Sequence, residues 1–480
     1  MINSSTDLAI EIGEPPGLKR WLAHLVPVRR GELVTVAVLT VNVFVLLTCY
    51  YVLKVVREPL ILLGGGAELK AYASAGQTLL LIGVIPAFGW LSARVTRLRL
   101  LTTMQLIFIG CLFGFYLLAH THAPIGLAFY LWLGIFNVLV VSNFWSFAND
   151  LYTEAQGKRV FAVIGVGASV GAIIGAFVPS VLHRLLGMHA LLLVAAGGLA
   201  LSIALYRIAD FRERGRRHAT PRAAPDADAS LDASARPAAD AGEPEPPMGT
   251  AGGFALVLKD RYLRLLAAML LIAMTINTSG EYVISKLATD RSHLLATEAA
   301  RSEYLSHFFS NYYGLVNLAS FALQALLVAR LMTRLGIRRV LFIMPLVVLV
   351  GWAGLFAFVS VTAVRIEKTV ENSLDYSLHN TLRHALFLPT SREAKYKAKA
   401  AIDTFFFRMG DVIAGLGLVF LFVHVLGLGE RAFAALNVAL AVCWFALAVR
   451  TGRLYDQLAA ERDAREQGQA AQAGSHVARR

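Results

Sequence analysis

Charged residues are scarce in this chain, since Asp, Glu, Lys and Arg make up 16% of its 480 residues, against about 25% in an ordinary soluble domain. Hydrophobic residues account for 57%, and the mean hydropathy is +0.60. This composition excludes a typical soluble protein and predicts an integral membrane protein. The net charge of +13 does not predict nucleic-acid binding, because the basic residues fall in alternate loops, as in multi-pass membrane proteins.

Cysteine is also rare, and Cys49, Cys111 and Cys443 each lie inside an apolar run. A thiol in such a run usually behaves as a small hydrophobic group, which argues against a disulfide framework. No His, Cys and acidic residues are spaced as a metal-ligand set, and no nucleophile has an obvious base. We therefore expect no enzyme activity, no catalytic residue, no metal and no cofactor.

Apolar runs are abundant instead, and segments of the roughly 20 residues that cross a bilayer recur about twelve times. The predicted spans are 33–53, 72–92, 100–120, 125–148, 160–182, 188–206, 264–288, 305–329, 338–360, 362–388, 400–424 and 431–449. Between the sixth and the seventh, the segment "RRHATPRAAPDADASLDASARPAADAGEPEPPMGT" has no apolar period. Such a segment predicts a disordered cytosolic linker between two halves.

The predicted domain organisation follows from these spans. It consists of a cytosolic N-terminal segment (1–32), an N-terminal six-helix bundle (33–210), the linker (211–255), a C-terminal six-helix bundle (256–450) and a cytosolic tail (451–480). Basic residues concentrate in the loops after even-numbered spans, as with Arg94, Arg97 and Arg99 after the second. This bias predicts a multi-pass protein of the plasma (inner) membrane with both termini in the cytosol.

Two observations favour a six-plus-six duplication. The loop "RVTRLRLL" after span two is similar to "RLMTRLGIRRVL" at the corresponding place after span eight, although basic loops also resemble each other by chance. Spans three, six, nine and twelve contain little that is polar and can face lipid all round, whereas spans one, four, seven and ten are polar. We predict an all-α integral membrane protein of about 12 transmembrane helices in a 6+6 major-facilitator-like arrangement, with those polar helices around a central cavity.

Span ten carries an unusual row of charge. Glu367, Glu371, Asp375 and His379 recur every fourth residue, and Lys368 is beside them. A helix with such a face cannot meet lipid, so it lines water or buries ion pairs. Two interpretations follow: structural pairing of Lys368 with Glu371 or Glu367, or lining of a cavity. The second applies most to the deeper residues, Asp375 and Asn380.

Spans one and seven also carry charges. In span one, Lys54 and Glu58 are four apart, which predicts a pair near the outer interface beside Arg57, with snorkelling of Lys54 to lipid headgroups as the alternative. In span seven, Glu281 lies about 25 Å along its helix and Lys286 further out. A lone carboxylate at such a depth pairs with a cation, carries a proton or binds substrate.

Two further segments are ambiguous. The run "GVGASVGAIIGA" in span five is apolar and follows no strand, so it predicts close helix packing rather than a phosphate loop. At the end of span four, Asn143, Asn149 and Asp150 precede Lys158 and Arg159. This second cluster predicts a cytosolic gate or a folded inside loop.

Several segments together resemble the bacterial and plastid ATP/ADP translocases, nucleotide-exchange transporters related to the major facilitators. These segments are "LKVVRE…GAELK", "NFWSFAND…GKRVFAVIGVGAS", "GEYVISKL" and "LDYSLHNTLRHALFLPTSREAKYKAKAAID". The resemblance implies a carrier that exchanges bulky anions, with basic residues meeting phosphates. By position, Arg57 with Glu58 resembles the family's Lys-Asp pair, and Glu281 resembles its functional glutamate.

The chain departs from that family after "YKAKAAID", where the translocases have a Gly-Lys-Ser-Gly element whose lysine serves nucleotide transport. Here residues 408–411 read Arg-Met-Gly-Asp. Asp411 is about 16 Å into its helix, near mid-bilayer, and its charge would repel phosphates. An intrahelical pair with Arg408 is the simplest way to make both charges tolerable.

Three functional hypotheses remain. One is an exchanger of nucleotides or other anions, whose phosphates are bound by Arg57, Lys158, Arg159 and Lys286. The second is a proton-coupled facilitator for another solute, in which Glu281, Asp375 or Asp411 carries the proton. The third is a membrane scaffold that does not transport. The expected partners are a small-molecule substrate and membrane lipid, without nucleic acid.

Overall fold

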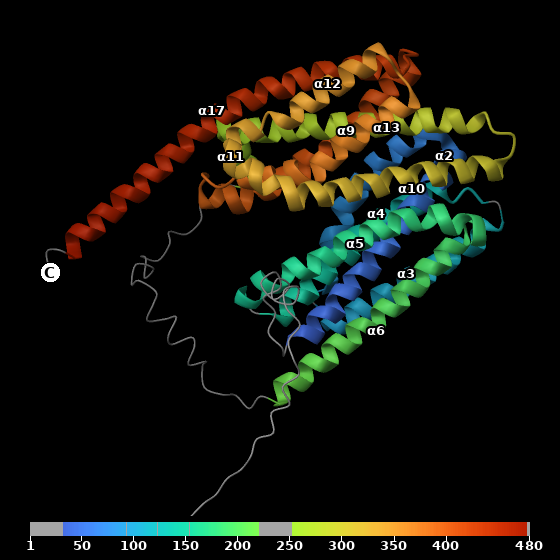
Figure 1. Cartoon of the computed structure of the whole chain (residues 1–480), viewed down its shortest axis with the longest axis horizontal. Helices are drawn as coiled ribbons and strands as arrows, with labels where there is room; N and C mark the ends of the chain where they lie inside the picture. Colours follow the sequence, from blue (N-terminus) through green and yellow to red (C-terminus); the bar gives the residue numbers. More distant parts are fainter. Residues whose placement is uncertain (1–31, 93, 122, 153, 220–251, 478–480) are drawn as a thin grey trace, which may run out of the picture.

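The computed structural model describes residues 32–92, 94–121, 123–152, 154–219 and 252–477. Outside these ranges lie residues 1–31 of the predicted N-terminal segment, residues 220–251 of the predicted linker, and the last three residues of the tail. The described residues that form regular structure are helical. Figure 1 shows that they form two groups of long helices, from α2 to α6 and from α9 to α17.

The first half of the chain contains α2 (Leu33–Ser92), α3 (Arg97–Ala119), α4 (Gly126–Leu151), α5 (Glu154–Leu186) and α6 (Ala190–Ala219). α2 is two helices joined at Gly66, whose φ of 73° interrupts the helical backbone. Glycine adopts this conformation without the steric penalty of a Cβ atom. The break allows residues on its two sides to belong to two different membrane spans.

The second half contains α8 (Gly253–Lys259), α9 (Arg261–His293), α10 (Glu298–Leu323), α11 (Ala329–Val340), α12 (Ile343–Ala357), α13 (Val361–Leu374), α14 (Asn380–Ala385), α15 (Lys399–Ala401), α16 (Phe407–Val412) and α17 (Glu430–Val477). Five π-helical segments join or extend them: η1 (Gln324–Val328), η2 (Asp375–His379), η3 (Ala394–Ala398), η4 (Ile402–Phe406) and η5 (Ile413–Val425). Three of these helices have an N-cap residue whose side chain accepts a hydrogen bond from a backbone N–H of the first turn. The N-caps are Asp260 before α9, Thr297 before α10 and Ser360 before α13.

The predicted number of spans is confirmed within the described residues. Nine helices there are long and apolar enough to cross a membrane. α2 provides two spans because of its break at Gly66, α12 is a shorter apolar helix, and α13 continues through η2 into α14 as the charged span ten. Two helices enter the predicted linker, since α6 continues through residues 211–219 and α8 begins at Gly253. α17 continues through most of the predicted tail, to Val477.

Small residues bring α5 against the first part of α2, as the sequence predicts. A Cβ atom added to Gly167, Gly171 or Gly175 would lie 2.6, 2.4 or 2.5 Å from a backbone oxygen of α2. Such close backbone approach is the use that membrane helices make of glycine every fourth residue.

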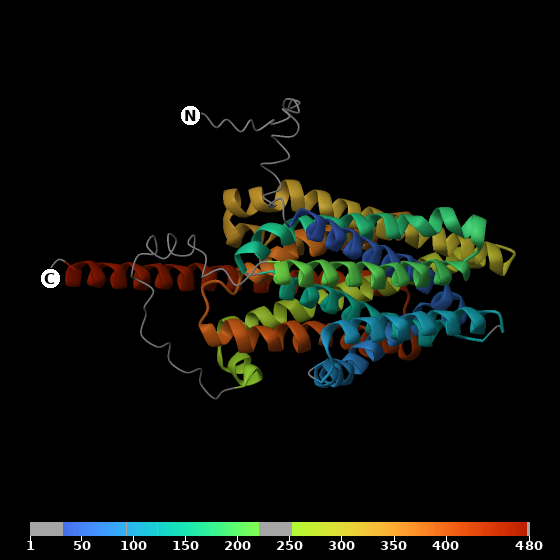
Figure 2. The same ribbon diagram turned by 90° about the horizontal axis from the view of Figure 1, so that it is seen from below.

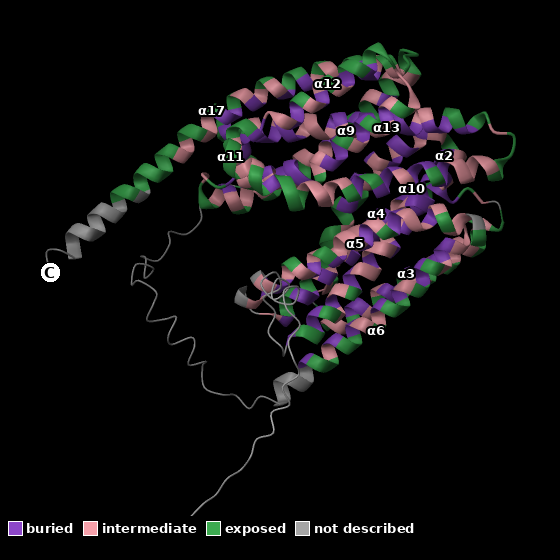
Figure 3. Cartoon of the chain, viewed as in Figure 1, coloured by how far each residue is buried: buried purple, intermediate pink, exposed green. Residues whose placement is uncertain are grey.

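The buried apolar side chains form two clusters, one in each half of the chain. The cluster of the C-terminal half also includes residues of α2, which belongs to the N-terminal half. Figure 3 shows this burial along the contact faces of the helices, with exposed residues on the outer faces. Spans three, six, nine and twelve do not face lipid all round, because each buries one polar side chain against a neighbour: Gln105, Ser202, Trp352 and Asn437.

The two halves make contact at one end of the molecule and diverge toward the other, where α6 ends (Figure 1). Ser310 and Asn317 of α10 donate hydrogen bonds to the carbonyls of Ala176 and Ala172 of α5, at 2.5 and 3.0 Å. α17 extends beyond the bundle at the diverging end (Figure 2). We call the end where the halves meet the closed end.

Candidate functional site

A cavity of about 230 Å³ lies between the two halves. We call it the central cavity. It is lined by spans one, four, seven and ten, as predicted, and also by spans two, eight and eleven. Its charged lining residues are Lys54, Arg57, Lys70, Glu281, Arg408 and Asp411. Five tyrosines line it as well: Tyr50, Tyr130, Tyr282, Tyr313 and Tyr376.

Glu58 organises the positive charges beside this cavity. Its carboxylate is fully buried, 2.6 Å from a guanidinium nitrogen of Arg57 and 2.7 Å from the ammonium nitrogen of Lys70. Tyr313, from the other half, donates a hydrogen bond of 2.9 Å to it. A buried carboxylate with this many donors is held in one orientation. Removing it would leave Arg57 without its ion-pair partner and Lys70 with only the more distant Glu281.

Lys54 does not pair with Glu58, contrary to the i,i+4 prediction. Its ammonium lies 4.2 Å from the centre of the Tyr313 ring and 5.3 Å from that of Tyr51. Within the described part of the chain, no carboxylate is within 4.0 Å of it. Lys54 also does not snorkel to the surface, because it lines the central cavity.

Lys70 links the two halves and was missed by the sequence analysis. Besides Glu58, its ammonium donates a hydrogen bond of 2.8 Å to Ser285 and lies 3.8 Å from the carboxylate of Glu281, both in α9. The segment "GAELK" contains this lysine. The i,i+4 rule cannot find the contact, because Gly66 ends the helix between Glu58 and Lys70.

Glu281 is part of a hydrogen-bond network inside the second half. Tyr312 and Asn372 donate to one of its oxygens at 2.9 and 3.0 Å. Asn277 donates to the side-chain oxygen of Asn372 at 2.7 Å. The network therefore fixes Glu281 from α10 and α13 while its other oxygen remains near Lys70. A buried polar network that is satisfied in this way specifies one geometry.

The structural interpretation of span ten holds for Lys368 and Glu371, whereas the buried Glu367 has a carboxylate oxygen without a hydrogen-bond partner. Lys368 is fully buried and lies 2.8 Å from Glu371, which also accepts a hydrogen bond of 3.4 Å from the indole of Trp352. Asp375 and Asn380 line a separate cavity of about 390 Å³ that includes Tyr376. Since Tyr376 also lines the central cavity, the two cavities adjoin.

Asp411 and Arg408 lie at the central cavity from α16. Thr278 donates a hydrogen bond of 2.6 Å to Asp411, and Thr78 donates one of 3.4 Å to its other oxygen. A nitrogen of Arg408 is 3.9 Å from that oxygen, so the intrahelical pair is present but long. The guanidinium remains 39% exposed and lines the cavity.

Two predicted site residues, Lys286 and Arg159, lie outside the lining of the central cavity. Lys286 is 3.2 Å from Asp290 and 3.9 Å from Glu68, and it is not part of the central cavity lining. Arg159 lies 3.6 Å from Glu32. The side chain of Lys158 falls outside what the structure describes. Among the described residues, no group of three His, Cys, Asp or Glu side chains is placed to hold a metal ion.

Comparison with known proteins places this geometry in a family. No curated protein sequence matched the chain. Solved structures are similar to it at low sequence identity: a POT family transporter in complex with 5-aminolevulinic acid (15% identity, TM-score 0.58, 88% of this chain and 96% of that chain) and the nucleoside transporter NupG (14%, 0.59, 86% and 98%). A bacterial homolog of the human lysosomal transporter Spinster, inward-facing and unoccupied, is also similar (13%, 0.57, 90% and 99%). The family model of the Major Facilitator Superfamily matches residues 63–367, more than half of the chain, and the chain therefore belongs to this superfamily.

Proposed function

We propose that this secondary transporter of the Major Facilitator Superfamily carries a small organic anion through the central cavity by alternating access. The observation that carries the proposal is the ammonium of Lys54, which lines the cavity from α2 and contacts tyrosine rings instead of a carboxylate. No carboxylate lies within 4.0 Å of it among the described residues, whereas Arg57, Lys70 and Arg408 each have one within that distance.

The charge balance of the cavity supports an anionic solute. Lys54, Arg57, Lys70 and Arg408 contribute four cations, and Glu58, Glu281 and Asp411 contribute three carboxylates. A surplus cation in a low-dielectric site is costly until a counter-charge arrives. A carboxylate or phosphate beside Lys54 would supply that counter-charge, and the surrounding tyrosines would supply hydroxyl donors and ring faces.

Alternating access fits the way the halves are joined. Lys70 joins Glu58 in α2 to Ser285 and Glu281 in α9 at the closed end. If the predicted orientation holds, the closed end faces outward and the cavity opens to the cytosol. A bound anion would compete with these carboxylates for the same cations, which weakens the contact between the halves when the cavity is loaded.

The size and the acids of the cavity favour an anion smaller than a nucleotide. Its volume of about 230 Å³ is below the range of roughly 300–1,000 Å³ for drug-sized ligands. Asp411 adds a negative charge where the ATP/ADP translocases place a lysine. ATP and ADP are nevertheless the first solutes to test, because of the resemblance to that family.

The test is counterflow by the purified full-length chain in liposomes, with labelled ATP, ADP and small carboxylates and phosphates. We expect saturable exchange of one small anion, and we expect Lys54→Gln to reduce it at least about tenfold through loss of a charge-assisted contact. Lys286→Gln is the matched control, since that lysine is paired and outside the cavity lining. Equal activity of the two variants would refute the role of Lys54.

A second candidate function is proton coupling to a non-nucleotide solute, and Asp411 is the observation that favours it. Its two nearest partners are the hydroxyls of Thr278 and Thr78, which can serve a carboxylate or, by rotating, a carboxylic acid. Uptake that stops when the proton gradient is dissipated would support this candidate. Uptake that survives in pure counterflow without a gradient would support simple exchange.

A further inference from the structure

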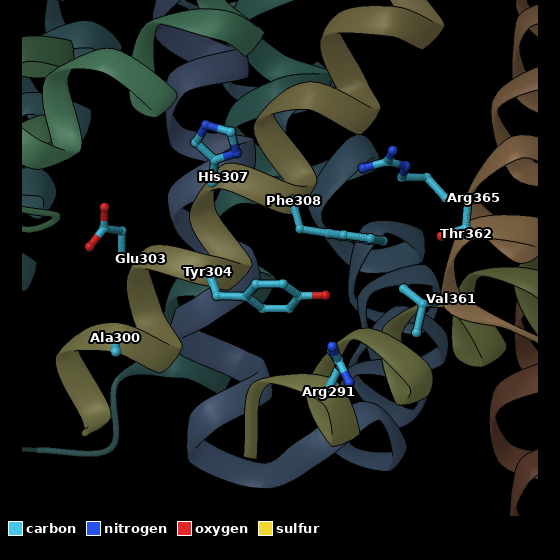
Figure 4. A pocket seen from close by; sticks show the side chains of 9 residues that line it. All are labelled: Arg291, Ala300, Glu303, Tyr304, His307, Phe308, Val361, Thr362 and Arg365. Carbon is cyan, nitrogen blue, oxygen red and sulfur yellow. The ribbon is translucent and has the colours of Figure 1, made fainter. Parts of the chain in front are cut away.

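A third cavity, of about 470 Å³, lies at the closed end within the C-terminal half. We call it the outer pocket. It is formed by the last turn of α9, the first turns of α10 and the first turn of α13, and none of its lining residues lines the central cavity. Figure 4 shows its polar side chains, which come from these three helices.

The outer pocket brings together two arginines. Arg291 comes from α9 and Arg365 from α13. Within the described residues, no carboxylate lies within 4.0 Å of either guanidinium. Arg365 is 5.6 Å from the centre of the Phe308 ring, and both positive charges interact electrostatically with the hydroxyl of Tyr304. The two arginines therefore line the same cavity from two different helices.

The single acid of the pocket does not neutralise them. Figure 4 shows the carboxylate of Glu303 on the opposite side of α10 from the Tyr304 hydroxyl. Glu303 instead interacts electrostatically with His183 of α5. The favourable position of a cation at a helix C-terminus explains Arg291 alone, but it does not explain why Arg365, from another helix, meets the same space.

We propose that the outer pocket is a binding site for an anion that carries a phosphate or carboxylate group. Two guanidinium groups present planar forks of donors that match such groups. The hydroxyls of Tyr304 and Thr362 line the same space, and the positive end of the α13 helix dipole adds to the field. The ligand comes either from solution or from the headgroup of an anionic lipid.

The position of the pocket connects it to the central cavity. Tyr304 is eight residues before Tyr312 on α10, which corresponds to about 12 Å along the helix, and Tyr312 donates to Glu281. A soluble anion bound at Arg291 and Arg365 would therefore lie about two helical turns from the hydrogen-bond network of Glu281. The binding site itself does not depend on what the central cavity carries.

The test uses the full-length chain in phosphatidylcholine nanodiscs, with the thermal unfolding midpoint followed by tryptophan fluorescence. Inorganic phosphate is titrated against chloride at matched ionic strength. The same measurement is repeated without phosphate in nanodiscs that contain phosphatidylglycerol. All variants are made in a Lys54→Gln chain, so that anion binding in the central cavity does not obscure the result.

We expect Arg365→Gln and Arg291→Gln to weaken the saturable effect of one of these two ligands at least about tenfold, through loss of a charge-assisted contact. Arg431→Gln, an exposed arginine at the start of α17 at the same end, is the matched control. An effect of phosphate identifies a soluble anion, and an effect of phosphatidylglycerol alone identifies a headgroup. If neither ligand distinguishes Arg291→Gln from Arg431→Gln, the proposal is wrong. Arg291 is exposed, so its variant keeps the test valid if Arg365→Gln does not fold.

Discussion

The ammonium of Lys70 lies 2.7 Å from the carboxylate of Glu58, although the helix that carries both residues breaks at Gly66 between them. This contact holds the second membrane span against the first. Lys70 also contacts Ser285 and Glu281, and so connects both spans to the C-terminal half. Glu58 and Lys70 thus support the closed end and the charge of the central cavity at the same time.

Glu58→Gln should destabilise the fold strongly. The substitution leaves Arg57 and Lys70 buried beside a neutral amide, and removal of one partner from a buried ion pair costs about 3–5 kcal/mol. The free energy of unfolding in detergent, measured by denaturant titration, checks this value. Glu68→Gln is the control, because Glu68 is partly exposed and its nearest cation, Lys286, is 3.9 Å away. Similar stability of the two variants would contradict the central place of Glu58.

Lys70→Met should loosen the closed end. The substitution keeps most of the side-chain volume but removes the charge that holds Glu58 to α9, so the halves should separate there more often. A cysteine at Ser310, which is buried against Ala176, should then react several-fold faster with a water-soluble maleimide, in a chain without its three native cysteines. Lys259→Gln, an exposed lysine of α8, should leave that rate unchanged. An unchanged rate in Lys70→Met would show that other contacts keep this end closed.

The sequence predicted the spans well because the bilayer sets their length and the cost of a polar group sets their composition. It also predicted the pairing of Lys368 with Glu371 and of Arg408 with Asp411, since both are local along a helix. The sequence did not predict contacts between residues that are far apart in the chain. Lys54 contacts the Tyr313 ring from the other half instead of Glu58, and no local rule contains that ring.

The sequence also placed two residues, Lys286 and Arg159, in a binding site that they do not line. Both were predicted as phosphate ligands, yet each lies beside a carboxylate outside the central cavity lining. Charge and position along a helix do not show which way a side chain faces, because the packing of neighbouring helices decides how each helix is oriented. The break at Gly336 in α11 depends on a single glycine with positive φ, and glycine also occurs in straight membrane helices for packing.

Gly171→Ala should destabilise the N-terminal half. A Cβ atom at this position would lie 2.4 Å from the carbonyl oxygen of Phe44 in α2, so the two backbones must separate, at a cost of about 1–3 kcal/mol for overpacking. Gly165→Ala on the same helix meets no atom within 4 Å and should be neutral or slightly stabilising, because alanine favours helix. Unfolding midpoints of the two variants, compared in the same detergent, test the difference. Equal midpoints would mean that α5 and α2 can move apart at Gly171 without loss of stability.

Asp411→Asn separates the charge of Asp411 from its hydrogen bonds. The amide oxygen can still accept from Thr278, so the local structure should survive, but the negative charge beside the cavity is lost. Charges roughly 8–16 Å apart interact by about 1–2 kcal/mol at an effective dielectric constant near 20. The KM for a transported anion should therefore fall by about five- to thirtyfold, while Asp411→Lys should lower it further. Counterflow across a range of substrate concentrations measures both values. A higher KM in Asp411→Asn, together with loss of dependence on the proton gradient, would instead identify Asp411 as the proton carrier of the second candidate function.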